Sequence, residues 1–167
     1  MDEFVNKVAN SGLITFNLED YYDLSERAIF DIKDCLFMGL VLKEKDFRGF
    51  IKTNDWSAYK NKHVAITCSA DAIVPTWAYM LLANALQPYA KRIIFGDIQM
   101  LESILITEAL NKVNIQDFAD QRVVIKGCGD LPVPTAAYVE ITAKLAPVAK
   151  SIMYGEPCST VPIMKRQ

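Results

Sequence analysis

Short runs of β-branched and aliphatic residues alternate along the chain with longer segments whose apolar residues recur at helical spacing. The runs at 64–67, 92–95, 123–126 and 151–154 are typical of buried parallel strands. A helical segment follows the first run and another follows the third. Each begins near a proline and ends before another, because proline suits the first helical position but not the interior. These prolines are Pro75 and Pro88 in one segment and Pro134 and Pro147 in the other.

The segment 98–109 predicts a further helix, because its apolar residues share one helical face. The first 60 residues have a different pattern. Residues 13–18 and 28–33 partly alternate and predict strands, 44–53 predicts a short helix, and the apolar run 35–42 fits either element. We interpret residues 1–60 as an N-terminal extension that adds edge strands and covers a face of a sheet.

The most informative pattern is an internal repeat. Residues 64–97 align without a gap on residues 123–156, an offset of 59, and 14 of the 34 aligned positions are identical. We take the repeats as residues 63–97 and 123–156. Each predicts a strand, a loop, a helix and a second strand. The alternative is that two unrelated units share the same proline and glycine punctuation.

We therefore expect one α/β domain over residues 1–167, with a mostly parallel sheet built from a duplicated βαβ unit. Two similar copies suggest strand order 2-1-3-4, in which the strands at 64–67 and 123–126 are neighbours. Ligands of such sheets bind at the carboxyl ends of the strands where the order reverses. The loops there are 68–71 and 127–130.

Composition narrows the class of protein. Of 167 residues, 51% are hydrophobic and 23% are charged, which is typical of a globular domain. The net charge of −2 shows no basic surplus for nucleic acid, and no apolar run is long enough to span a membrane. The acidic, polar N-terminus does not resemble a signal peptide, so we expect a cytoplasmic protein.

One candidate site is an anion-binding loop at this sheet edge. Both loops lead into helix N-termini, whose free N–H groups favour negative charge. Gly127 and Gly129 permit close approach of a ligand, Lys126 supplies a positive charge, and Asp71 and Asp130 border the site. The two aspartates alternatively cap their own helices.

A second candidate is a metal site. Cys68, Cys128 and Cys158 lie just after predicted strands, together with the carboxylate of Glu156. Thiolates and a carboxylate are ligands for zinc, iron or an iron–sulfur cluster. Free cysteines also pack as small apolar residues, which is our interpretation of Cys35. Because Cys68 aligns with Gly127 rather than with Cys128, the repeat does not produce a symmetric pair of ligands.

Three blocks carry a resemblance over nearly the whole chain. They are KGCGDLPVPTAAYVEITAKLAPVAKSIMYGEPCSTVPI, TCSADAIVPTWAYML and GLVLKEKDFRGFIKTNDW. They resemble a family of bacterial proteins, mostly from Bacteroidetes, known as domain of unknown function 2480. The family is often encoded near iron–sulfur cluster assembly genes. The resemblance implies a cytoplasmic bacterial protein connected with iron–sulfur or sulfur metabolism, and it supplies no catalytic residues.

The first functional hypothesis is a metal- or iron–sulfur-handling accessory protein whose partners are iron–sulfur assembly proteins. The alternative is a small-molecule enzyme that binds an anionic ligand between the strands at 64–67 and 123–126, although no nucleophile–base pair is recognisable. A third hypothesis is an interaction protein whose apolar N-terminal extension mediates a homodimer.

Overall fold

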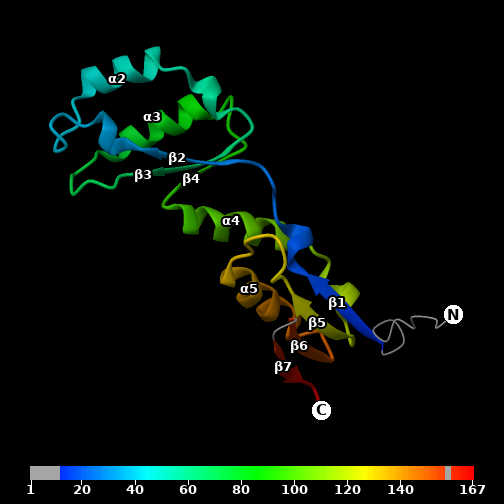
Figure 1. Cartoon of the computed structure of the whole chain (residues 1–167). Helices are drawn as coiled ribbons and strands as arrows, with labels where there is room; N and C mark the ends of the chain where they lie inside the picture. The colour runs from blue at the N-terminus through cyan, green and yellow to red at the C-terminus, as the bar shows by residue number, and fades with distance from the viewer. Residues whose placement is uncertain (1–11, 157–158) are drawn as a thin grey trace. The chain divides into compact units, whose positions relative to one another are not determined.

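The structure is a computed structural model that describes residues 12–156 and 159–167. The chain divides into two compact units, and unit 2 is inserted into the sequence of unit 1 (Figure 1). Unit 1 comprises Met1–Asp23 and Ser103–Gln167, and unit 2 comprises Leu24–Glu102. The expected extension over residues 1–60 is therefore shared between the two units.

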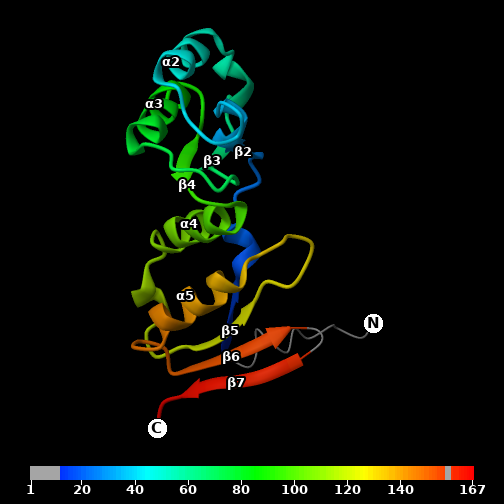
Figure 2. The ribbon, with the colours of Figure 1, turned by 90° about the vertical axis from the view of Figure 1, so that its left-hand side faces the viewer.

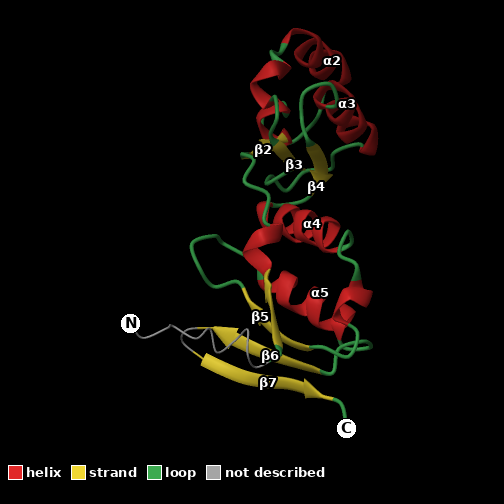
Figure 3. Cartoon of the chain, turned by 90° about the vertical axis from the view of Figure 1, so that its right-hand side faces the viewer, coloured by secondary structure: helices red, strands yellow, loops and turns green. Residues whose placement is uncertain are grey.

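Unit 2 contains a three-stranded parallel sheet of order β2-β3-β4. Its strands are β2 (Arg27–Asp31), β3 (His63–Thr67) and β4 (Arg92–Phe95). Its helices are α2 (Glu44–Thr53) and α3 (Thr76–Leu86), with short 3-10 turns η2 (Ile32–Cys35) and η3 (Trp56–Tyr59). Figure 3 shows α2 and α3 on the same side of this sheet.

The core of unit 2 forms where these helices meet the sheet. Alternate strand residues such as Phe30, Val64 and Ile66 face Phe47 of α2 and Leu82 of α3. This alternation follows from the two-residue period of a strand, which directs every second side chain to the helices.

Unit 1 contains a four-stranded sheet of order β1-β5-β6-β7. The strands are β1 (Leu13–Asn17), β5 (Arg122–Lys126), β6 (Ser151–Glu156) and β7 (Ser159–Lys165). The first three are parallel, and β7 runs antiparallel beside β6 (Figure 2). The helical elements are α4 (Ile98–Leu110), which begins within the sequence of unit 2, α5 (Thr135–Leu145) and the turns η1 (Leu18–Tyr21) and η4 (Ile115–Phe118).

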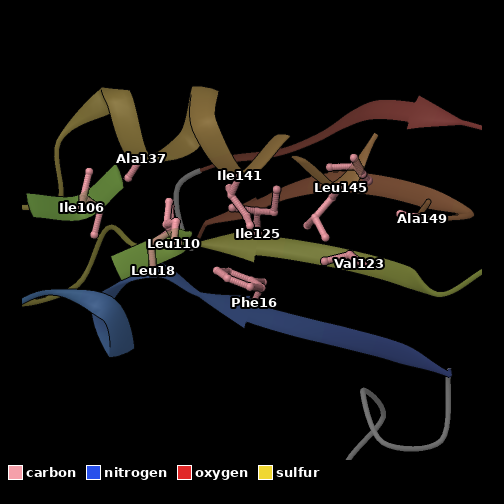
Figure 4. Packing of buried hydrophobic residues seen from close by; sticks show 11 residues of the cluster. Phe16, Leu18, Ile106, Leu110, Val123, Ile125, Ala137, Ile141, Leu145 and Ala149 are labelled. Atoms are coloured by element: carbon pink, nitrogen blue, oxygen red, sulfur yellow. The ribbon is translucent and has the colours of Figure 1, made fainter. Parts of the chain in front are cut away.

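One face of this sheet carries the core of unit 1. Phe16, Val123 and Ile125 pack against Ile141 and Leu145 of α5, as Figure 4 shows. The part of α4 in unit 1 covers the same face. None of the described helices of unit 1 packs on the opposite face.

The mixed α/β fold and its mainly parallel strands agree with the prediction from the sequence. The predicted strand order 2-1-3-4 is wrong, because β3 and β5 lie in different sheets. Each is flanked by an N-terminal strand on one side, β2 for β3 and β1 for β5, and by its own crossover strand on the other. Neither central strand has an open edge for the other. The sequence analysis also missed β7.

The two units share backbone details at the 59-residue offset. Asn61 and Asp120 both adopt positive φ, at 61° and 58°. The N–H of Asn61 donates to the carbonyl of Tyr89 at 3.0 Å, and the N–H of Asp120 donates to the carbonyl of Val148 at 2.9 Å. The matching turns therefore hold the entry to β3 and β5 in the same way.

The apolar run 35–42 forms neither of the two elements considered for it. It is a tight hairpin in which Phe37 and Val41 form an antiparallel bridge. Met38 and Gly39 at its tip have φ of 52° and 70°. Two consecutive positive φ values are typical of type I′ turns, which favour Asn-Gly. Methionine in this conformation is strained.

We predict that Met38→Asn stabilises the protein. Asparagine tolerates the left-handed conformation better, and the gain should reach about 1 kcal/mol in the free energy of unfolding. Urea unfolding of the variant and the wild type measures it. Met80→Asn is the control, because Met80 is 67% exposed on α3 and its backbone φ is not positive. A less stable Met38→Asn variant would contradict the assignment of strain.

Candidate functional site

The loop that follows β5 is anchored by a buried carboxylate. Glu156, the last residue of β6, is 5% exposed, and its Oε1 accepts three hydrogen bonds. The donors are the N–H of Gly127 at 2.6 Å, the N–H of Cys128 at 3.1 Å and the hydroxyl of Tyr138 at 2.9 Å. A buried carboxylate needs such donors to offset its loss of hydration. Glu156 therefore fixes the backbone on which Cys128 sits.

Tyr138 is the side-chain member of this network. It lies on α5, and burial raises its pKa above the usual range, helped by its hydrogen bond to Glu156. Tyr138 therefore remains a neutral donor at physiological pH. The network couples α5 to the ends of β5 and β6.

A second carboxylate holds the far end of the loop. Oε1 of Glu19, from η1, accepts the N–H of Leu131 at 2.9 Å. A Cβ added at Gly129 would lie 2.5 Å from this oxygen, and one added at Gly127 would lie 2.9 Å from the Tyr138 hydroxyl. The glycines thus allow close approach of the chain's own side chains, whereas the sequence suggested that a ligand approaches them.

The loop borders two clefts. The first, of about 480 Å³, lies on the uncovered face of the sheet. It is lined by Val124 and Met153 from the strands, by the loop, and by the charged residues Lys126, Glu19 and Glu156. The second, of about 440 Å³, lies between the loop and α5 and is lined by Leu131–Val133, Thr135, Tyr138 and Tyr154. Cys128 is exposed and lines both clefts.

Two of the three predicted thiols belong to different units. Cys128 follows β5 in unit 1, whereas Cys68 follows β3 in unit 2 and is half-buried. Cys158 lies outside the described residues. Within the ranges 12–156 and 159–167, no group of three or more His, Cys, Asp or Glu side chains could hold a metal ion. Glu156, which the sequence suggested as a ligand, hydrogen-bonds the loop.

Cys35 belongs to unit 2, whereas this loop belongs to unit 1. It packs partly against the core of unit 2, and burial raises the pKa of its thiol to about 11. A thiol with that pKa is almost entirely protonated at neutral pH, which makes it a poor nucleophile and metal ligand.

Asp71 and Asp130 are exposed in their loops and do not cap the helices that follow. The N-cap residues are Pro75 for α3 and Pro134 for α5, and neither helix has a side-chain cap. The capping alternative for the two aspartates is therefore wrong. Asp130 adjoins the loop that Glu19 and Glu156 hold, and Asp71 belongs to unit 2.

The corresponding edge of unit 2 uses a different carboxylate. Asp31, at the end of β2, accepts the N–H of Ser69 at 3.1 Å and the hydroxyl of Ser69. It also accepts the N–H of Lys33 at 3.0 Å. Burial opposes ionisation, but these hydrogen bonds prevail and lower the pKa of Asp31. Each unit thus ties down the loop after its central strand with an acidic side chain.

The sequence analysis missed Glu19, Tyr138 and Asp31 as residues of the sheet edges. Tyr138 carried a signal, because it is paired with Tyr79 in the repeat. The sequence signal for Glu19 and Asp31 was weaker, because each residue only lies at or just after the end of a predicted strand. Their roles depend on which strands pair, and that pairing was predicted wrongly.

Comparison with protein families finds a match over nearly the whole chain. The model of a family described as protein of unknown function (DUF2480) matches residues 2–166. The chain belongs to this DUF2480 family. Searches of curated proteins and of solved structures find no match. In the described part of this DUF2480 protein, every helix is too short or too polar to cross a membrane.

We predict that Glu156→Ala lowers the free energy of unfolding by about 1–3 kcal/mol, because the buried N–H of Gly127 loses its acceptor. Tyr138→Phe removes one hydrogen bond and should cost about 0.5–1.5 kcal/mol. Urea unfolding measures both. Equal stability of Glu156→Ala and the wild type would show that the carboxylate does not anchor the loop.

We also predict that Asp31 contributes to the acid sensitivity of unit 2. Because its folded pKa is lowered, its stabilisation is present above the unfolded pKa of about 3.9 and is lost as the pH falls through the folded pKa. Asp31→Asn should flatten the fall in stability below about pH 4. Thermal midpoints from pH 7 to pH 2 measure this, with the exposed Asp71→Asn as the control. An unchanged slope in Asp31→Asn would reject the assignment.

Proposed function

We propose that the protein handles a thiophilic metal ion or an iron–sulfur group as cargo, with Cys128 of unit 1 as the thiol that meets it. The observation that carries the proposal is an exposed thiol on a loop whose backbone is held by two glutamates. A fixed loop presents its side chain without a large loss of entropy on binding.

The charges around the first cleft favour a cation over an anion. Glu19 and Glu156 contribute two carboxylates, and Lys126 is the single cationic side chain among the described residues that line it. The N–H groups of Gly127, Cys128 and Leu131, which would hold an anion, already donate to these carboxylates. The thiolate of Cys128 is a ligand that suits zinc or iron, and the two carboxylates that hold the loop add negative charge beside it.

Transfer fits this site better than permanent storage. Cys128 supplies one thiolate, whereas structural zinc and iron–sulfur sites use about four protein ligands. The remaining ligands would come from the protein that delivers or accepts the cargo, for which an iron–sulfur assembly protein is the proposed partner. Cys158, two residues after Glu156 in sequence, and a second copy of the chain are further candidate sources. The chemistry requires a reduced thiol, which suits a cytoplasmic location.

A second candidate function is the binding of an anionic small molecule in the second cleft. The N-terminus of α5 has no side-chain cap, and Thr135 lines this cleft. No charged side chain is among its described lining residues, so a carboxylate or phosphate would meet no repulsion there. In this second candidate function, the anionic ligand binds in a cleft within unit 1 rather than between β3 and β5.

We also infer that the two units arose by duplication and that their loops diverged. The order strand, 3-10 turn, helix, 3-10 turn, strand, helix, strand is common to both, and so are the matching turns at Asn61 and Asp120. The duplication would include β1 and β2 as well as the repeats visible in the sequence. It would explain why Ser69 occupies the position in unit 2 that corresponds to Cys128.

The test is titration of the full-length reduced protein with Co²⁺, followed by the thiolate-to-cobalt charge-transfer absorption. We predict that Cys128→Ser weakens Co²⁺ binding at least tenfold and removes that absorption, because the thiolate is the soft ligand. Cys68→Ser, which changes a thiol in unit 2, should bind as the wild type does.

Wild-type affinity in Cys128→Ser would reject the metal proposal. The anionic alternative has its own measurement, in which inorganic phosphate raises the thermal midpoint of the wild type and of Cys128→Ser equally. Cys158→Ser, examined in parallel, reports whether the thiol outside the described residues contributes.

A further inference from the structure

A hairpin of unit 2 carries four exposed apolar side chains, which we call the apolar knob. They are Phe37 (49% exposed), Met38 (79%), Leu40 (63%) and Val41 (55%). Scattered exposed apolar residues are normal on a protein surface, but four within five consecutive positions form a patch. Such patches mark interaction sites.

The knob has a defined conformation. The N–H of Phe37 donates to the carbonyl of Val41 at 2.7 Å, and the N–H of Leu40 donates to the carbonyl of Phe37 at 3.1 Å. Both ends are anchored, because Ile32 before it and Leu42 after it are buried in the core of unit 2. A preorganised loop loses little freedom on binding.

The residue at the first tip position is not one that this type of turn favours. Met38 has a φ of 52°, a conformation that suits asparagine or glycine, yet it is the most exposed member of the knob. Neither local backbone preference nor burial accounts for methionine there. Backbone strain in an exposed loop points to a role outside the fold.

We propose that the apolar knob inserts into a concave apolar groove of a partner protein. Aromatic residues and methionine are enriched at the centres of protein interfaces. Lys43 also lies beside the tip, with its Nζ 3.4 Å from the centroid of the Phe37 ring. The groove that complements this surface therefore has a carboxylate at its rim, next to the Phe37 position.

The charges around the knob argue against a lipid bilayer as its occupant. The flanking segments 33–34 and 43–46 hold three lysines and three acidic residues, and Glu44 pairs with Arg48 at 3.1 Å. Peripheral membrane segments normally add a basic surplus that attracts anionic headgroups. This surface has balanced charges.

The area of the knob argues against a second copy meeting it knob to knob. At about 200 Å² for each large apolar side chain and the exposures above, the knob offers on the order of 500 Å². A stable interface buries roughly 800 Å² per partner. A groove that also contacts the sides of the hairpin reaches that area, whereas two convex tips do not.

The test starts with the full chain in its native host, with benzoylphenylalanine in place of Met38 as a photo-crosslinker. The same crosslinker in place of Met80 is the matched control, because Met80 is an exposed methionine on α3, outside the hairpin. We expect an adduct with one protein from position 38 and not from position 80. That protein is then purified and its affinity for the full chain is measured.

The decisive comparison uses Met38→Asn and Leu40→Asp. We expect both to bind the purified partner at least tenfold more weakly than the wild type, while Met80→Asn binds normally. Because Met38→Asn should be at least as stable as the wild type, loss of binding by that variant cannot come from unfolding. Unchanged Co²⁺ binding in these variants separates this proposal from that for Cys128.

Four results would overturn the proposal. They are no adduct beyond that of the Met80 control, adducts with lipid alone, adducts only within the chain or with a second copy, and wild-type affinity of Met38→Asn for the purified partner.

Discussion

The parallel pairing of each central strand with an N-terminal strand is the constraint on which the rest of the structure depends. β1 pairs with β5, although the whole of unit 2 lies between them in the sequence. β2 pairs with β3 within unit 2. Parallel neighbours require a crossover, and here the crossover between β1 and β5 contains an entire unit. The same pairing brings the ends of β1, β5 and β6 to one edge of a sheet. Glu19 and Glu156 thereby hold the loop between them.

The elements were predictable from the sequence where the signal is local. The helix predicted over 44–53 matches α2, and the strands of both repeats lie within a residue or two of their predicted positions. The strand order was not predictable, because β1 and β2 lie outside the repeat that is visible in the sequence. Residues 14–17 match 28–31 at an offset of 14 rather than 59. A search at one fixed offset cannot join these strands to the repeats.

A cleft beside the loop after β5 was predictable from the sequence, but the hydrogen bonds of that loop were not. Parallel strand ends direct attention to the loop after β5, and Lys126, Gly127, Cys128 and Gly129 do line a cleft there. What the sequence could not show is that the N–H groups of the loop are used internally. Glu156 accepts hydrogen bonds from two of these N–H groups, which lie 28 and 29 residues away in the sequence. Glu19 accepts one from a third, which lies 112 residues away in the sequence. Long-range hydrogen bonds of this kind depend on the tertiary fold, and they support the proposed metal cargo over the anionic alternative at this cleft.

The two units show how a common edge can acquire different chemistry. In unit 2, Asp31 comes from the strand before the central one and holds both the N–H and the hydroxyl of Ser69, which leaves that side chain engaged. In unit 1, the residue that corresponds to Ser69 is Cys128. Its N–H donates to Glu156, which lies on β6, on the other side of the central strand from β1. A thiol is a weak hydrogen-bond donor, so a carboxylate gains little by accepting from it. The anchor on β6 therefore fixes the backbone, and the thiol of Cys128 stays exposed. This difference is the reason why the proposed cargo binding is assigned to the thiol of Cys128 in unit 1.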